Sequence, residues 1–326
     1  PESGLRARCF RDTVGMVHKE DSVKYNRTAR RFVALVIVAL LSVCLASEPK
    51  RASTVTGGAL EIFSLAMPQF GDGRTRTIRV WLPEGYDAND RSRRYPVLYM
   101  HDGQNLFDSL TSFIGEWRVD ESLSALFSQG AERTIVVGID NGAVHRANEL
   151  SPDWIRSGVG RALIAAPEGD AYAAFVAVTV KTYIDLHFNT KTEREYTSVG
   201  GSSMGGIMSF YLAMEYPSVY ARAIVFSPAL QVYSDGAIEG YIGKVGFAPA
   251  MPDLYIFAGG ATGGSPAGSA YDEACIEKYP AVMEALLRAR GDPGKIGVKV
   301  DPSRIHHESV WAEYFPVAWR YLTAGK

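Results

Sequence analysis

The amino-acid sequence predicts an α/β protein with a mostly parallel central sheet and helices on both of its faces. Short, continuous apolar segments bounded by turn residues are typical of buried strands. Segments with apolar residues three and four positions apart lie between them, as expected of helices. Strands that alternate with helices usually pair in parallel and are covered on both sides, so this order predicts a doubly covered sheet.

The expected elements follow one another along most of the chain. Strands are predicted at residues 76–82, 95–100, 134–139, 196–200, 223–226, 254–257 and 297–300. Helices are predicted at residues 117–127, 169–187, 205–216, 281–290 and 311–322. Residues 259–268, rich in Gly, Ala, Ser and Pro, are typical of a loop. We expect one domain over residues 47–326, long enough to bury a large core.

Residues 1–46 are expected to be an export leader. Basic residues at positions 24–31 precede an apolar run, residues 32–45, that has the length of a signal-peptide core and is short for a membrane span. Met16 is a candidate translation start within this segment. We therefore expect a secreted or periplasmic protein with no stable membrane span once the leader is removed. An uncleaved N-terminal anchor is the alternative.

Composition and charge exclude several classes of protein. Of the 326 residues 47% are hydrophobic and 21% are charged, which is typical of a globular domain. The net charge is −2, and no basic stripe lies outside the N-terminus, so no nucleic-acid partner is expected. Cys275 is the one cysteine after the leader, which leaves no intramolecular disulfide. Because His and Cys do not cluster, no metal and no cofactor are predicted.

Residues 200–206 read Gly-Gly-Ser-Ser-Met-Gly-Gly and contain the pattern Gly-x-Ser-x-Gly. A strand is expected before this pattern and a helix after it, which is the context of a turn that carries a nucleophilic serine. Glycines suit such a turn because side chains beside the strained serine would clash with the adjoining elements. We predict that Ser203 is a nucleophile. The alternative is a glycine loop before an ordinary helix.

A nucleophilic serine needs a base, and in this type of fold an acid and then a histidine follow the serine along the chain. Of six histidines, only His306 and His307 come after Ser203, and their order does not choose between them. The acid is expected in a loop after a later strand. Asp272 is our first candidate, and the alternatives are Glu273, Asp235 and Asp301.

An oxyanion hole is also expected beside the serine. It needs two backbone N–H groups, and one belongs to the residue after the nucleophile, Met204. The other should come from the loop after an early strand, residues 101–105, where Gly103 permits a turn and Gln104 is the candidate donor.

Four blocks of the sequence resemble the putative esterase family of α/β-hydrolases, over roughly residues 60–325. They are residues 95–108 (Tyr-Pro-Val-Leu-Tyr-Met-His-Asp-Gly-Gln-Asn-Leu-Phe-Asp), residues 136–141 with the following Arg146 and Glu149, residues 201–206 with 226–228, and residues 306–311. This family includes carbohydrate esterases, such as acetylxylan and feruloyl esterases, together with enterobactin-type esterases, S-formylglutathione hydrolases and mycolyltransferases. The resemblance implies an α/β-hydrolase fold. It also implies that the catalytic histidine stands five residues before Trp311, at His306.

The sequence departs from the family pattern at the acid. In the family an acid commonly follows the Gly-rich end of a strand directly, whereas residues 258–262 here read Ala-Gly-Gly-Ala-Thr. Asp272 then takes the role after an inserted loop, or the acid is displaced or missing. By the same resemblance Trp117 lines the substrate pocket or packs a helix. Arg146 and Glu149 form an ion pair or contact substrate.

Together these patterns predict a serine carboxylic-ester hydrolase that works through an acyl-enzyme. The expected substrate is a small-molecule or saccharide ester outside the cell or in the periplasm, such as an acylated carbohydrate. One alternative is a non-catalytic protein that binds an ester or saccharide on an esterase scaffold, because no carboxylate stands near Thr262. The other is an acyltransferase, in which a sugar hydroxyl replaces water.

Overall fold

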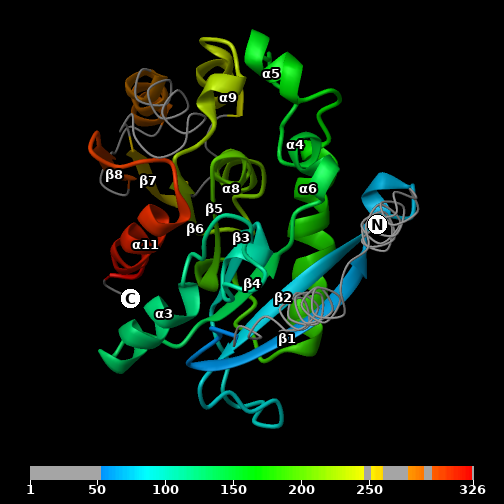
Figure 1. Ribbon diagram of the computed structural model, residues 1–326, viewed down its shortest axis with the longest axis vertical. Helices are drawn as coiled ribbons and strands as arrows, with labels where there is room; N and C mark the ends of the chain where they lie inside the picture. The colour runs from blue at the N-terminus through cyan, green and yellow to red at the C-terminus, as the bar shows by residue number, and fades with distance from the viewer. Residues whose placement is uncertain (1–52, 246–250, 260–277, 290–295, 325–326) are drawn as a thin grey trace, which may run out of the picture. The chain divides into compact units, whose positions relative to one another are not determined.

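A computed structural model describes residues 53–245, 251–259, 278–289 and 296–324 (Figure 1). These residues form an eight-stranded sheet in the order β1-β2-β4-β3-β5-β6-β7-β8. The strands are β1 (Gly58–Ala66), β2 (Thr75–Pro83), β3 (Val97–His101), β4 (Ile135–Ile139), β5 (Thr197–Ser202), β6 (Arg222–Phe226), β7 (Asp253–Gly259) and β8 (Ile296–Asp301). β2 pairs antiparallel with β1 and β4, whereas the strands from β4 to β8 pair in parallel.

Helices cover both faces of the sheet. α3 (Val119–Ser128) and α11 (Glu308–Thr323) contribute to one apolar cluster. A second cluster lies on the other face and includes α6 (Gly169–Ala174), a π-helical segment (Phe175–Val180), α7 (Lys181–His187), α8 (Met204–Glu215) and α9 (Ala237–Val245). Successive residues of β3 alternate between the clusters, as strand geometry requires: Val97 and Tyr99 face α8, and Leu98 and Met100 face α11.

The predicted fold class is confirmed, and each predicted strand lies within a residue or two of an observed strand. The predicted helix at residues 169–187 is continuous, with the π-helical segment in its middle. Residues 278–289 are helical, and the short helices α4 (Arg146–Glu149) and α5 (Gly158–Leu163) were not predicted, nor was α9. Strand β1 was also missed because every residue in it is at least partly exposed, so no apolar face marks it in the sequence.

Three sequence predictions fall outside the described residues. These are the export leader at residues 1–46, the loop predicted at residues 259–268 except for Gly259, and the candidate acids Asp272 and Glu273. Within the described ranges, no helix is both long enough and apolar enough to cross a lipid bilayer.

Candidate active site

Ser203 occupies a strained turn between the end of β5 and the start of α8. Its φ of 56° and ψ of −122° are rare for a residue with a side chain. A Cβ on Gly201 would lie 2.8 Å from backbone atoms of Gly205, and a Cβ on Gly206 would lie 2.8 Å from the carbonyl oxygen of Phe226. Ser203 N donates to that same oxygen at 2.9 Å. The strand, the turn and the helix are therefore packed so closely that only glycine fits at positions 201 and 206.

The turn opens into a cavity of about 720 Å³ at the carboxyl edge of the parallel strands. Ser203, His306 and Gln104 all line this cavity, although they come from three distant parts of the chain. Because the carboxyl ends of parallel strands meet at one edge, the loops after β3, β5 and β8 bring these side chains together.

The two candidate histidines have different positions. His306 lines the cavity, and its ring stands edge-on to the Trp311 indole, with ring centres 5.0 Å apart and planes at 85°. His307 is the N-cap of α11: its Nδ1 accepts a hydrogen bond from Ser309 N at 3.1 Å, and Ser309 Oγ lies 2.9 Å from the same atom. His307 caps the helix and does not line the cavity, so His306 is the candidate histidine that shares the cavity with Ser203.

Trp311 links the His306 region to the sheet. Its indole Nε1–H donates to Ser227 Oγ at 3.3 Å, in a buried position directly after β6. Trp117 packs behind it, stacked on Phe226 with ring centres 5.6 Å apart and 5.5 Å from the Trp311 ring. Trp117 is 2% exposed and is not one of the residues that line the cavity. Its contact with the site therefore runs through Trp311.

The two candidate oxyanion donors come from different elements: Gln104 lines the cavity with Ser203, and Met204 follows Ser203 in the chain. Gln104 is in the short 3-10 turn after β3, where its side-chain Oε1 accepts from Asn141 N at 3.1 Å and its carbonyl oxygen accepts from Thr111 Oγ1 at 2.7 Å. These bonds hold the Gln104 backbone in one orientation at the cavity wall. Met204 is the first residue of α8, and an N–H in a first helical turn has no partner within the helix.

Of the four candidate acids, the structure describes two. The Asp235 side chain is 94% exposed and forms an ion pair with Lys278 at 3.0 Å. Asp301 accepts hydrogen bonds from Ser303 Oγ and Tyr314 OH, both at 2.6 Å, and these bonds lower its pKa to about 2. Neither residue lines the cavity. Asp272 and Glu273 lie outside the described residues.

A buried ion pair forms part of the cavity wall. Arg146 Nε and Nη2 donate to the two carboxylate oxygens of Asp102 at 2.7 and 2.9 Å, and Asn141 Nδ2 donates to the same carboxylate at 2.8 Å. Burial alone would raise the pKa of Asp102, but the Arg146 charge and these hydrogen bonds hold it below its usual value.

The expected pairing of Arg146 with Glu149 is wrong. Glu149 is 1% exposed and bonds instead to Arg76 at 2.7 Å and Arg74 at 3.1 Å, away from the cavity. Arg146 and Glu149 are separated by only three positions, but each finds a partner from a distant strand or loop. Spacing along the chain could not reveal those partners.

Sequence reasoning also missed Glu308. This residue lines the cavity, is 7% exposed and is the first residue of α11. Burial raises the pKa of its carboxyl group, although a hydrogen bond from its own backbone N–H and the charges of His306 and His307 act to lower it. Glu308 lies within the histidine block, residues 306–311, and this position was the one feature of the sequence that could have indicated a place in the site.

Comparison with known proteins identifies the family of this chain. Residues 72–317 match the family described as Putative esterase. The chain belongs to this family. By that membership it is an esterase, and the solved structures it resembles, which include feruloyl and siderophore esterases, share its fold.

The individual relatives are distant. The protein YbbA of Bacillus subtilis (strain 168), itself uncharacterized, is 20% identical over 247 residues, which are 76% of this chain and 92% of that protein. The siderophore hydrolase EstA from Aspergillus nidulans superposes with a TM-score of 0.60 at 18% identity, covering 86% of this chain and 99% of its own. A feruloyl esterase module from Clostridium thermocellum, complexed with sinapinate, gives a TM-score of 0.57 at 17% identity, covering 85% and 93%. At these identities the likeness is one of fold.

Proposed function

We propose that this esterase hydrolyses carboxylic esters with Ser203 as nucleophile and His306 as general base. One observation carries the proposal: a serine on a strained strand-to-helix turn lines the same cavity as a histidine from the far end of the chain. A serine hydroxyl becomes an effective nucleophile only when a base can take its proton.

The reaction follows from the positions of these groups. Ser203 Oγ attacks the ester carbonyl carbon while its proton passes to His306. The negative charge on the carbonyl oxygen is held by the backbone N–H groups of Met204 and Gln104, and the N-terminal end of α8 adds favourable potential. His306 then protonates the departing alcohol, which leaves an acyl-enzyme on Ser203. A water molecule then attacks the acyl group while its proton passes to His306. As the bond to Ser203 breaks, His306 returns that proton to Ser203 Oγ, and the acid is released.

We assign the third member of the triad to Asp272, with Glu273 as the next candidate. Two facts support this choice over Asp235 and Asp301, the other candidates from the sequence: the Asp235 carboxylate pairs with Lys278, and the Asp301 carboxylate is held by Ser303 and Tyr314. The acid would orient the imidazole and stabilise its charged form.

The cavity suits an ester that has both an apolar and a polar part. Phe113 and Ile114, 85% and 63% exposed, form an apolar side of the cavity, and Asn141 and the Arg146–Asp102 pair form a polar side. The structural neighbours include a siderophore hydrolase and a feruloyl esterase module complexed with sinapinate. Together with the apolar run at residues 32–45, typical of an export signal, these features favour an acylated carbohydrate or a similar ester in a secreted or periplasmic setting.

The decisive experiment is hydrolysis of p-nitrophenyl acetate and butyrate by wild type, Ser203→Ala and the matched control Ser202→Ala. Ser203→Ala should lower kcat by about 10⁶-fold, because the triad acts as a unit. Ser202→Ala alters the neighbouring serine without removing the nucleophile, so it should retain most of the activity. Near-wild-type hydrolysis by Ser203→Ala would overturn the proposal.

Two further measurements complete the assignment. Asp272→Asn should lose most of its activity while Glu273→Gln keeps it, and the reverse result would exchange their roles. A wild-type protein that neither hydrolyses esters nor reacts at Ser203 with a fluorophosphonate probe would be a binding protein. Acyl transfer to an added polyol in preference to water would identify a transferase.

A further inference from the structure

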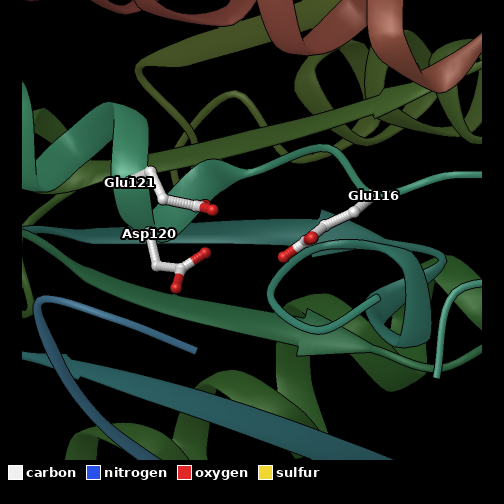
Figure 2. Close-up of side chains that lie close together, drawn as sticks. All are labelled: Glu116, Asp120 and Glu121. Atoms are coloured by element: carbon white, nitrogen blue, oxygen red, sulfur yellow. The ribbon is translucent and has the colours of Figure 1, made fainter. Parts of the chain in front are cut away.

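Three carboxylates converge beside the start of α3, at some distance along the chain from the Ser203 turn. Figure 2 shows the side chains of Glu116, Asp120 and Glu121 pointing toward one another. One ligand oxygen from each lies within 4.8 Å of those from the other two. None of the three residues lines the active-site cavity.

The buried member of this cluster has an oxygen with no partner. Asp120 is 0% exposed, and its Oδ2 accepts a hydrogen bond from Thr56 N at 2.7 Å. Its Oδ1 has no hydrogen-bond partner, and neither does Glu121 Oε2. One oxygen of Asp120 points toward the other two carboxylates (Figure 2). A buried carboxylate oxygen without a donor is costly, so this arrangement calls for a bound proton or cation.

The protein supplies little positive charge there. Within the described ranges, the one ion pair to the cluster is Arg118 Nε to Glu121 Oε1 at 3.1 Å, and the Arg118 side chain is 63% exposed. Thr54 Oγ1 lies 3.0 and 3.1 Å from the two Glu116 oxygens, as a neutral donor. In keeping with this, burial raises the pKa of Asp120, and the neighbouring Glu121 raises it further.

We propose that Glu116, Asp120 and Glu121 bind a divalent cation that prefers oxygen ligands, with Ca²⁺ the best fit. Ca²⁺ coordinates oxygens at about 2.3–2.6 Å, so oxygens on opposite sides of the ion are about 5 Å apart. The three ligand oxygens lie within 4.8 Å of one another, so one Ca²⁺ ion can reach all of them. Mg²⁺ demands a near-ideal octahedron at about 2.1 Å and usually binds through only one or two carboxylates, so a cluster of three favours Ca²⁺. Water would complete the Ca²⁺ shell.

Such an ion would join three separate segments of the chain. Residues 53–56 reach the cluster through Thr54 and Thr56, Glu116 ends the loop that borders the active-site cavity, and Asp120 and Glu121 belong to α3. Trp117, next to Glu116, packs against Trp311 beside His306. The bound ion would therefore stiffen the cavity wall without touching the reacting atoms.

The test uses the full chain freed of metals with a chelator. Isothermal titration with CaCl₂ should show one site, and the unfolding temperature should rise with Ca²⁺ concentration because only the folded state binds the ion. Terbium ions should give luminescence sensitised by the adjacent Trp117. Mg²⁺ should bind at least 10-fold more weakly than Ca²⁺.

Variants separate this site from adventitious binding. Asp120→Asn and Glu116→Gln should each weaken Ca²⁺ binding at least 10-fold, and the half-exposed Glu116 serves if Asp120→Asn fails to fold. Glu84→Gln, an exposed carboxylate elsewhere, should bind like wild type. No heat or stabilisation at millimolar Ca²⁺, or equal binding by wild type and Glu116→Gln, would overturn the proposal. In that case Asp120 and Glu121 share a proton.

Discussion

Two buried aspartates on neighbouring segments of this esterase show opposite electrostatic behaviour. Asp102 follows β3 and receives two hydrogen bonds from Arg146 and one from Asn141, and its pKa is lowered. Asp120, at the start of α3, receives one backbone hydrogen bond and has no paired cation within the described residues, and its pKa is raised. Burial raises the pKa of both carboxyl groups. Whether a cation lies beside the carboxylate therefore decides whether its pKa ends above or below the usual value.

This difference distinguishes a site whose charges are balanced by the protein itself from a site whose charges are not. In the cavity wall the charges of Asp102 and Arg146 offset each other, and the cavity can receive a neutral ester without a counter-ion. At the Glu116–Asp120–Glu121 cluster the negative charges exceed the positive charge the chain provides. A buried carboxylate without a cation is unfavourable, so it indicates that a ligand binds there, whereas a buried carboxylate paired with an arginine gives no such indication.

The largest expected effect on stability comes from removing the cation beside Asp102, which leaves this aspartate without an ion partner, as Asp120 is. Arg146→Met removes the cation and leaves the Asp102 carboxylate buried without its ion partner. The free energy of unfolding at pH 7 should fall by about 2–4 kcal/mol, since the pair is largely buried. Urea unfolding measures this change.

The matched control is Arg118→Met, which removes a 63% exposed arginine from Glu121. Exposed ion pairs contribute little, so the change should stay within about 0.5 kcal/mol. Equal destabilisation by both variants would contradict the view that the Asp102–Arg146 pair compensates a buried charge.

A second, smaller effect concerns a buried base beneath the serine turn. His101 is 2% exposed, its Nδ1 lies 3.0 Å from Tyr172 OH, and burial lowers its pKa to about 4 from a usual value of about 6.5. Between these values the unfolded chain binds a proton that the folded chain does not. Stability from this group is therefore complete above pH 6.5 and is lost as the pH falls toward 4, by roughly 3 kcal/mol at most.

Chemical unfolding of wild type and His101→Gln at pH 7.5 and pH 4.5 checks this prediction. The wild type should lose more stability than the variant between the two pH values. The same loss in both proteins would show that His101 does not account for it.

The smallest expected effect tests how His306 is supported. Trp311→Phe keeps an aromatic ring beside His306 but removes the indole N–H that donates to Ser227 Oγ. We expect a loss of about 1 kcal/mol in unfolding free energy and a few-fold decrease in kcat, with KM little changed. Trp319→Phe, on the same helix and also buried, is the control and should leave kcat unchanged. A kcat decrease in both variants would assign the effect to helix packing alone.

Much of the fold could be read from local patterns. The apolar segments predicted the central strands β3 to β7 because these are covered on both faces. Residues 201–206 identified the turn because its glycines and serine stand together in one short segment, between a strand pattern and a helix pattern. Strand β1 escaped prediction because it is a partly exposed edge strand. The sequence by itself thus determined the strand and helix pattern and the conformation around Ser203.

Tertiary structure decided what depends on residues far apart in the chain. It placed His306 on the cavity wall and made His307 a helix cap, paired Arg146 with Asp102 in place of Glu149, and buried Asp120 beside two other carboxylates. In each case the outcome depends on a partner from another element, and on whether burial removes the water that would otherwise screen the charge. The spacing of residues along the chain encodes neither the partner nor the degree of burial, so these pairings could be known only from the tertiary structure.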